Sequence, residues 1–516
     1  DTLDARNGRR PSVSITDMAR HTAIFALTAF LALAAFDGAD ATTCISSSNP
    51  LDINKEYFPT SDRVAVDGTA GSAEVTVAGD FSITYHKHFK VLKNLRVTPV
   101  KTYVLRMCGS DVPTKYPNGT AIESDAKHFS VPVKGVGVGG SIPMAFLEQL
   151  DLLDKIKVAD PQYVHSPCVR NAEKAGTILG QGSGFSHAAG WADKTESNDA
   201  VDLVVTDAWS TGACGCDKDV VFDPSSDDTP LGRAEWIKYI STFFNEENRA
   251  NVAFAREKAA YDATKKIAKD IADVQAALQK PKKKCAWVNE AYDSNWNSFW
   301  KLDTTSYKLA YCADAGMEAV TDKDSNGVAK NYVKSSTDLK NALADVDVII
   351  DQTYDPDPAT NLDTQEKVLT KLGITLKQGA VLLRLDRELS DNGATSTKFY
   401  ENNAGDSGIN WAWTESGVLR PAHVLQGLVH AVWPDSVYEI PAACVDYFRD
   451  VTAGEKPVVK DHTHCEKWDK ANADAQCVTN IISDDEMALI RASPAAGRPS
   501  FIVAILVALV VALVGA

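Results

Sequence analysis

A long segment without proline divides this chain into two parts. It covers residues 233–279, contains only residues that favour or tolerate a helix, and is followed by Pro281. Just before it, Thr229 and Pro230 provide a capping side chain and a proline for the first turn. The larger apolar side chains recur mostly at spacings of three, four and seven, as on one face of a helix: Phe254, Tyr261, Ile267, Ile271, Val274 and Leu278. The pattern predicts a connecting helix over residues 229–280, about 60 Å long if unbroken, with one possible break between Asn245 and Asn251.

Strand and helix patterns alternate on both sides of this segment. Before it, residues 133–138 and 201–206 are short apolar strands, and residues 145–153 have helical spacing. After it, the predicted strands are residues 285–288, 308–311, 346–350 and 380–385. Such alternation is typical of parallel βα units. An additional β-hairpin is predicted near the start, in which residues 81–85 pair with residues 103–107.

The simplest architecture is therefore α/β, with two Rossmann-like lobes joined by a long backbone helix. The N-terminal lobe, with its leading hairpin, covers residues 42–228, and the C-terminal lobe covers residues 281–440. Two acid-flanked apolar strands, residues 200–207 and 345–351, resemble one another across the helix. Ligands of open parallel sheets bind beyond the carboxyl ends of the strands, so a ligand cleft is predicted between the lobes.

The two ends of the sequence indicate a secreted and anchored protein. Residues 18–41 combine a basic start, an apolar run and a small-residue cleavage site, which are typical of a signal peptide, and residues 1–17 are interpreted as an over-extended leader. Residues 498–516 are almost entirely apolar and follow small residues, as in a lipid-anchor attachment signal. A short transmembrane span is the alternative. We expect a mature protein at the cell surface, anchored in the membrane, with a cysteine-containing tail over residues 441–497.

The charge and the cysteines support this compartment. The net charge of −16 argues against nucleic acid as a partner, because its binders need a basic face. Ten cysteines in an oxidising compartment indicate disulfides. We expect Cys285 to pair with Cys312, since both are placed at comparable points of successive strands in the C-terminal lobe. Asn118 begins an Asn-Gly-Thr glycosylation acceptor.

Three motifs are interpreted as structural rather than chemical. Residues 135–140 contain GxGxxG before a helix, with Asp160 further along, but the glycines overlap the strand itself and the secreted setting does not suit a nicotinamide enzyme. His86 and His88 alternate along a predicted strand with no third ligand evident, which suggests a solvated face rather than a metal site. His462-Thr463-His464-Cys465 is more metal-like, but Cys465 is expected in a disulfide.

Aromatic and arginine side chains carry the prediction of a ligand site. Tryptophans and tyrosines in loops offer stacking surfaces for a large flat ligand, and arginines near a strand end could pair with anionic groups. The alternative interpretation is that half of these tryptophans are core residues. The candidate ligand-binding residues are Ser141, Trp191, Trp209, Tyr292, Trp296, Trp300, Gln352, Tyr354, Arg384 and Arg387. No nucleophile–base pair is evident among them, so neither an enzyme nor a cofactor is predicted.

Four segments carry a resemblance to a known family. They are residues 131–134 (VPVK) leading into 145–156 (AFLEQLDLLDKI), 230–238 (PLGRAEWIK) with 243–245 (FFN), 314–316 (DAG), and 420–425 (RPAHVL). Together they resemble the periplasmic-type substrate-binding proteins of iron-siderophore and cobalamin ABC importers, over about residues 75–440.

The resemblance implies two rigid lobes, a shallow cleft, small bending on binding and no catalysis. It implies capture of a ferric siderophore for uptake, with cobalamin or haem as the alternative ligand. An anchored adhesion or structural protein on the same fold is the alternative from another class. The anchor, the cysteines and the tail from Tyr447 depart from the family, and the partner importer therefore stays unknown.

Overall fold

The computed structural model describes residues 44–58, 73–159, 164–180, 198–206, 216–292, 297–323, 329–330, 335–354, 362–391, 409–434, 447–460 and 462–465. Residues up to Leu51 form a unit of their own, and the unit that begins at Asp52 holds both lobes. The predicted leader, signal peptide and anchor signal lie outside the described residues, as does most of the predicted tail. None of the helices in the described ranges combines the length and the apolar character needed to cross a membrane.

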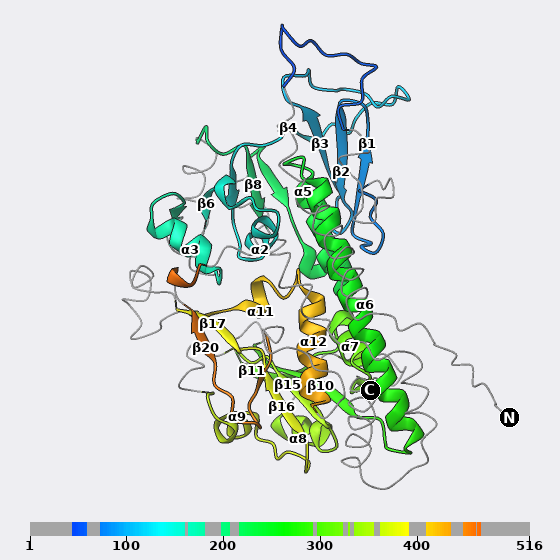
Figure 1. Ribbon diagram of the computed structural model, residues 1–516, viewed down its shortest axis with the longest axis vertical. Coiled ribbons are helices and arrows are strands. Elements are labelled where there is room, and N and C mark those ends of the chain that lie inside the picture. The colour runs from blue at the N-terminus through cyan, green and yellow to red at the C-terminus, as the bar shows by residue number, and fades with distance from the viewer. Residues whose placement is uncertain are drawn as a thin grey trace, which may run out of the picture. The chain divides into compact units, whose positions relative to one another are not determined.

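A four-stranded sheet precedes the first βα unit (Figure 1). Its strands, in spatial order, are β1 (Phe81–Tyr85), β2 (Phe89–Asn94), β3 (Lys101–Met107) and β4 (Lys127–Val131). The predicted pairing of β1 with β3 was wrong, because β2 lies between them and pairs antiparallel with both. Residues 86–88 form the turn from β1 to β2, in which the His86 amide donates to the Phe89 carbonyl at 2.9 Å. The two histidines therefore do not alternate along a strand.

The N-terminal lobe is a parallel five-stranded sheet with helices between its strands. Its strands run in the order β7 (Leu179–Gly180), β6 (Ile156–Ala159), β5 (Val136–Val138), β8 (Leu203–Thr206) and β9 (Asp219–Val221). The helices are α2 (Ile142–Gln149) and α3 (Pro167–Lys174), with short 3-10 turns η2 (Leu153–Lys155) and η4 (Pro224–Ser226). The predicted alternation of strand and helix is confirmed here, with each predicted strand shortened at its start.

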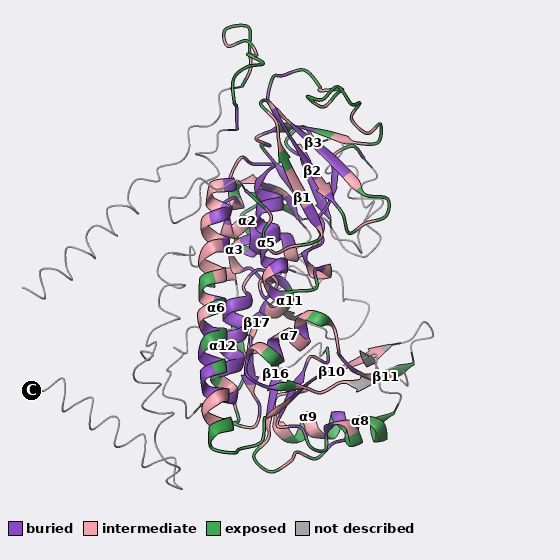
Figure 2. Cartoon of the chain, turned by 90° about the vertical axis from the view of Figure 1, so that its right-hand side faces the viewer, coloured by how far each residue is buried: buried purple, intermediate pink, exposed green. Residues whose placement is uncertain are grey.

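The connecting segment is a pair of helices, α5 (Pro230–Ser241) and α6 (Glu247–Ala277). Thr229 caps α5 as expected, since its hydroxyl accepts from the Gly232 amide at 2.9 Å. The break falls at Asn245, whose φ of 59° lies in the left-handed region that asparagine tolerates. The chain reverses there, and the two helices pack against each other. The contact that shows this is Lys238 Nζ of α5, which lies 4.5 Å from the ring centroid of Phe254 of α6. Helix α5 is buried along most of its length (Figure 2).

Helix α6 joins the two lobes. Its first turn holds Arg249, which donates to the Leu150 carbonyl of the N-terminal lobe at 2.5 Å. Its second half contributes Tyr261, Ile267, Ala268 and Ile271 to the core of the C-terminal lobe. At 31 residues, α6 is about 46 Å long. The protein is thus α/β, with two Rossmann-like lobes joined by a long backbone helix (Figure 1).

The C-terminal lobe is a mixed sheet with a parallel centre. Its strands run in the order β11 (Ser298–Leu302), β10 (Lys284–Tyr292), β15 (Val348–Asp351), β16 (Val381–Arg384) and β19 (Arg449–Asp450), and β12 (Glu318–Ala319) also pairs with β10. The pairs of β10 with β15 and of β15 with β16 are parallel. The helices of this lobe are α7 (Ser306–Asp314), α8 (Ser336–Leu343), α9 (Gln365–Leu372), α11 (Ala412–Glu415) and α12 (Pro421–Val432).

Two small sheets and one 3-10 turn complete the described elements. They are the ribbon of β13 (Asp322–Lys323) with β14 (Ala329–Lys330), the sheet of β18 (Ile409–Trp411), β17 (Glu388–Asp391) and β20 (Val458–Lys460), and the turn η6 (His462–His464). Strands β19 and β20 come from the segment predicted as the tail, and both pair with strands of the C-terminal lobe.

The predicted strand over residues 308–311 was wrong. These residues belong to helix α7, in which Lys308, Tyr311 and Cys312 are buried. Spacings of three and four put these side chains on one face of a helix, whereas a strand would place Tyr311 on the face opposite Lys308 and Cys312. A short apolar run cannot be assigned to helix or strand by periodicity alone.

Two disulfides are described in full. Cys285 of β10 is bonded to Cys312 of α7, with the Cα atoms 5.9 Å apart, which confirms the predicted pair. The reason given for it was wrong, since Cys312 lies on a helix and not on a strand. The second disulfide joins Cys168 of α3 to Cys465, across 297 residues of sequence. It ties the N-terminal lobe to the segment that follows η6.

Candidate ligand-binding site

Several predicted site residues lie where parallel strands of the two sheets end. In the N-terminal lobe, β5 ends at Val138, and Gly139 and Gly140 lead directly to Ser141, the N-cap residue of α2. The Gly139 amide donates to the Val205 carbonyl of β8 at 2.8 Å, which keeps this turn against the sheet. Gly139 and Gly140 thus connect strand and helix, while Gly137 lies in the strand itself, as the overlap of the glycines with the strand predicted. Ser141 is half-buried at this edge.

Three strands of the C-terminal lobe reach the same edge together. Val288 of β10 is in register with Asp351 of β15, and Asp351 is in register with Arg384 of β16. Gln352 and Tyr354 follow β15, and Arg387 follows β16. The structure therefore brings four predicted residues of this lobe to one edge of the sheet: Gln352, Tyr354, Arg384 and Arg387. Tyr354 is the most open of them, with 66% of its surface exposed.

Gln352 is held by a buried ion pair. The Lys308 ammonium lies 2.6 Å from Asp303 Oδ2 and donates to Gln352 Oε1 at 2.5 Å, and Gln352 Nε2 donates to Asp303 Oδ2 at 3.2 Å. Burial would raise the pKa of Asp303, but the neighbouring Lys308 outweighs it and the pKa falls to about 2. Asp303 is therefore ionised over the whole physiological range. The triad fixes the side chain of Gln352, and with it the start of the loop that carries Tyr354.

Arg384 does not face solvent. Its side chain is 0% exposed and forms ion pairs with Asp351 and Asp386, the latter at 2.6 Å. Asp386 also binds Arg449 of β19, at 2.7 Å. Arg384 was predicted to pair with an anionic ligand. In the structure its guanidinium already pairs with two carboxylates. Its place in the fold is inside a buried ionic network.

Arg387 is placed differently. Its side chain is 25% exposed and its Nη1 lies 2.7 Å from Glu455 Oε2, which is itself 38% exposed. An ion pair this open contributes little to stability. A guanidinium in such a pair can exchange its carboxylate partner for an anionic group of a ligand. Of the two arginines, Arg387 is the one placed to do so.

The aromatic residues divide between the edge and the core. Trp300 lies in β11 opposite Glu290 and packs, partly buried, against the core of the C-terminal lobe. Trp236 and Trp287 are buried, and Trp413 stacks near Trp287 at a centroid distance of 5.7 Å. Tyr292 ends β10, but its side chain is outside the described part of the structure. Three further predicted residues lie outside the described ranges: Trp191, Trp209 and Trp296.

Sequence analysis missed a buried contact between the lobes. Glu415 of α11 accepts hydrogen bonds from the amides of His165 at 2.6 Å and Ser166 at 3.0 Å, at the start of α3. Burial, and next the Glu148 carboxylate, raise the pKa of Glu415 well above its usual value. The Cys168–Cys465 disulfide lies in the same region. Because 250 residues separate Glu415 from His165, no local pattern could indicate the contact.

No protein family matches this sequence, and no curated protein is detectably similar to it. Among solved structures, a periplasmic haem-binding protein from Pseudomonas aeruginosa matches at 11% identity and a TM-score of 0.38, over 63% of this chain and 99% of that one. The similarity is to periplasmic binding proteins. The petrobactin-binding protein from Bacillus subtilis matches at 16% identity and a TM-score of 0.32, over 59% of this chain and 93% of that one.

A third match is an ABC-type Fe3+-hydroxamate transport system from Saccharomonospora viridis, at 17% identity and a TM-score of 0.31, over 49% of this chain and 88% of that one. These proteins are of the class that the sequence resembles. Identities and TM-scores at this level do not assign a ligand to this chain. Within the described residues, no group of three or more His, Cys, Asp or Glu is arranged to hold a metal ion.

Proposed function

We propose that this protein captures a ferric siderophore outside the cell, between its two lobes, for uptake. The observation that carries the proposal is the common edge at which β15 and β16 end beside β10. It presents an exposed tyrosine, Tyr354, and an arginine in an open ion pair, Arg387. Ser141 stands at the corresponding end of β5 in the other lobe. Open parallel sheets bind their ligands at such edges.

The chemistry of the edge suits a large chelate. Aromatic side chains offer apolar area with a polar tip, which a flat or bulky ligand can contact without being enclosed. Arg387 can neutralise an anionic chelate, because a guanidinium pairs with carboxylates in a bidentate way. Asp303, Lys308 and Gln352 are joined by hydrogen bonds, which hold the Gln352 side chain at the edge. A site that only binds and releases its ligand needs no catalytic group, so we propose binding without chemistry.

We expect the protein to act at the cell surface, held in the membrane by a C-terminal lipid anchor. This part of the proposal rests on the amino-acid pattern of residues 18–41 and 498–516. Phospholipase treatment of cells that express the full chain should release the protein. Retention in the membrane after complete treatment would favour the short transmembrane span instead.

Tryptophan fluorescence of the purified ectodomain tests the ligand class. Saturable quenching by a ferric siderophore is expected, with weaker binding of the iron-free siderophore. Haem and cobalamin are titrated in parallel, because they are the alternative ligands. If haem or cobalamin binds saturably and a ferric siderophore does not, the proposed ligand becomes the one that binds. If none of the ligands binds, the protein is not a chelate receptor, and an adhesion or structural role becomes the better account.

A further inference from the structure

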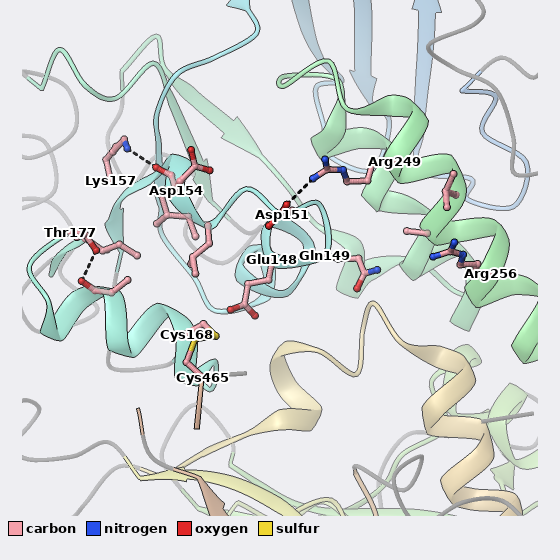
Figure 3. Close-up of a pocket in the computed structure, with 16 residues that line it drawn as sticks. Glu148, Gln149, Asp151, Asp154, Lys157, Cys168, Thr177, Arg249, Arg256 and Cys465 are labelled. Atoms are coloured by element: carbon pink, nitrogen blue, oxygen red, sulfur yellow. Dashed lines mark hydrogen bonds and ion pairs between the residues drawn. A yellow bond between two sulfur atoms is a disulfide. The ribbon is translucent and has the colours of Figure 1, made fainter. Parts of the chain in front are cut away.

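A pocket in the N-terminal lobe lies apart from the proposed chelate site. It has a volume of about 990 Å³ and is lined by the end of α2, the η2–β6 segment, α3, residues 177–178 and α6 (Figure 3). None of the predicted ligand-binding residues lines it. The Cys168–Cys465 disulfide forms part of its wall. Small-molecule sites commonly measure about 300–1,000 Å³, so the pocket is large enough for a ligand of its own.

The apolar part of this pocket is aliphatic. No aromatic side chain is among the described residues that line it. The apolar lining residues are Leu153, Ile156, Ala172, Ile178, Val252 and Ala253. Such a surface favours a flexible hydrocarbon chain through burial of apolar area and offers a flat aromatic ligand no aromatic side chain to stack on. The pocket therefore differs in chemistry from the edge that carries Trp300 and Tyr354.

One charged side chain of the pocket has no hydrogen-bond or ion-pair partner among the described residues. Arg249 and Arg256 are seven residues apart on α6, which puts both on the side of the helix that faces Gln149 (Figure 3). Arg249 is engaged, by the Leu150 carbonyl at 2.5 Å and by Asp151 at 3.4 Å. Arg256 has no hydrogen-bond or ion-pair partner among the described residues.

The other charged side chains of the lining already have partners. The Glu148 carboxylate accepts from the Ser166 hydroxyl, Asp154 pairs with Lys155 at 2.9 Å, and Lys157 donates to the Asp154 carbonyl at 2.6 Å. Arg256 is therefore the lining cation that is free to meet a ligand in the described structure. A guanidinium binds a carboxylate through two parallel hydrogen bonds. The acidic groups nearby, Glu148 and Asp151, would repel a dianion more than a monoanion.

We propose that this pocket binds an aliphatic carboxylate, with the carboxylate on Arg256 and the hydrocarbon chain against the partly exposed side chains of Leu153, Ala172 and Val252. The lining of this pocket shares no residue with the proposed chelate site. Binding at one should persist when the other is disabled.

Isothermal titration of the ectodomain with decanoate tests the proposal. Saturable binding is expected, with 1-decanol and decyl phosphate binding more weakly, because one lacks the charge and the other carries more. Arg256→Gln should weaken decanoate about tenfold or more, the effect of losing a charge-assisted pair of hydrogen bonds. Val252→Trp should weaken it as well, since the indole would fill the volume beside Arg256.

Lys269→Gln is the matched control on the same helix. Lys269 is 71% exposed, pairs with Asp273 and does not line the pocket, so its loss should leave decanoate binding unchanged. Three results would overturn the proposal: no saturable binding of decanoate, equal affinity in Arg256→Gln and the unmodified chain, or loss of decanoate binding in Trp300→Ala. The last would place decanoate at the chelate site. Melting temperatures of the variants separate lost binding from lost folding.

Discussion

Replacing Arg384 by methionine is expected to lower the free energy of unfolding by roughly 3–5 kcal/mol. The side chain is 0% exposed, and its partners Asp351 and Asp386 are at most 1% exposed. Methionine fills a similar space but leaves Asp351 as a buried carboxylate without the guanidinium. The cost is that of an uncompensated buried charge rather than of one lost contact. Urea unfolding followed by circular dichroism measures it.

Arg387→Met is the matched control for this experiment. Its ion pair with Glu455 is open to solvent, so we expect a change of about 1 kcal/mol or less. The double variant Arg384→Met/Asp351→Leu should recover much of the lost stability, because it removes both members of the buried pair. If Arg384→Met is no more destabilising than Arg387→Met, the network around Arg384 is not formed as described.

Glu235→Gln is expected to be nearly as damaging, at roughly 3 kcal/mol. Glu235 of α5 is fully buried and accepts hydrogen bonds from the amides of Thr76, Val77 and Ala78 at 2.6–2.8 Å, while Lys238 lies 2.7 Å away. A glutamine would turn an NH2 group toward these donors. Glu246→Gln is the control, since that side chain is 32% exposed with one ion pair at 3.5 Å, and we expect a loss of about 1 kcal/mol or less.

Glu235 also gives stability a dependence on pH. Burial alone would raise its pKa, but Lys238 and the hydrogen bonds outweigh burial and lower the pKa below 4.5. A carboxyl whose pKa is lower in the folded state stabilises the fold above its unfolded pKa. This contribution is therefore intact at neutral pH and is lost as the pH falls below about 4.5. The loss on acidification should be smaller in Glu235→Gln than in the unmodified chain. An equal loss in both would assign the acid sensitivity to other groups.

The order of strands and helices was largely predictable, because short apolar runs and helix starts are local signals. Thr229 marked the start of α5, and the asparagines marked its break near Asn245. Whether the chain continues or reverses at such a break depends on packing, as between Lys238 and Phe254. The error at residues 308–311 has the same origin, since only the core decides how a short apolar run folds.

The strand-end positions of the candidate residues were predictable, but their environment was not. Strand ends follow from the alternation, so Gln352, Arg384 and Arg387 were found. The sequence cannot show that Asp351 and Asp386 surround Arg384, because burial depends on neighbours from β19. The Glu415 contact and the Cys168–Cys465 disulfide span 250 and 297 residues. Arg256 was missed for a related reason, since only the packing of α6 beside α2 shows that it lacks a partner.

The affinity of Arg387→Ala for a ferric siderophore tests the central claim most directly. Arg387 stands at the strand edge in an open ion pair, so its removal should weaken binding about tenfold or more while the melting temperature stays nearly unchanged. Trp300→Ala should weaken binding as well, with some loss of stability, because Trp300 packs against the core of the C-terminal lobe. Leu343→Ala, in the core at 2% exposure, should instead cost about 2–5 kcal/mol of stability and leave the affinity of the folded protein intact. Normal binding by both Arg387→Ala and Trp300→Ala would contradict a chelate site at this edge.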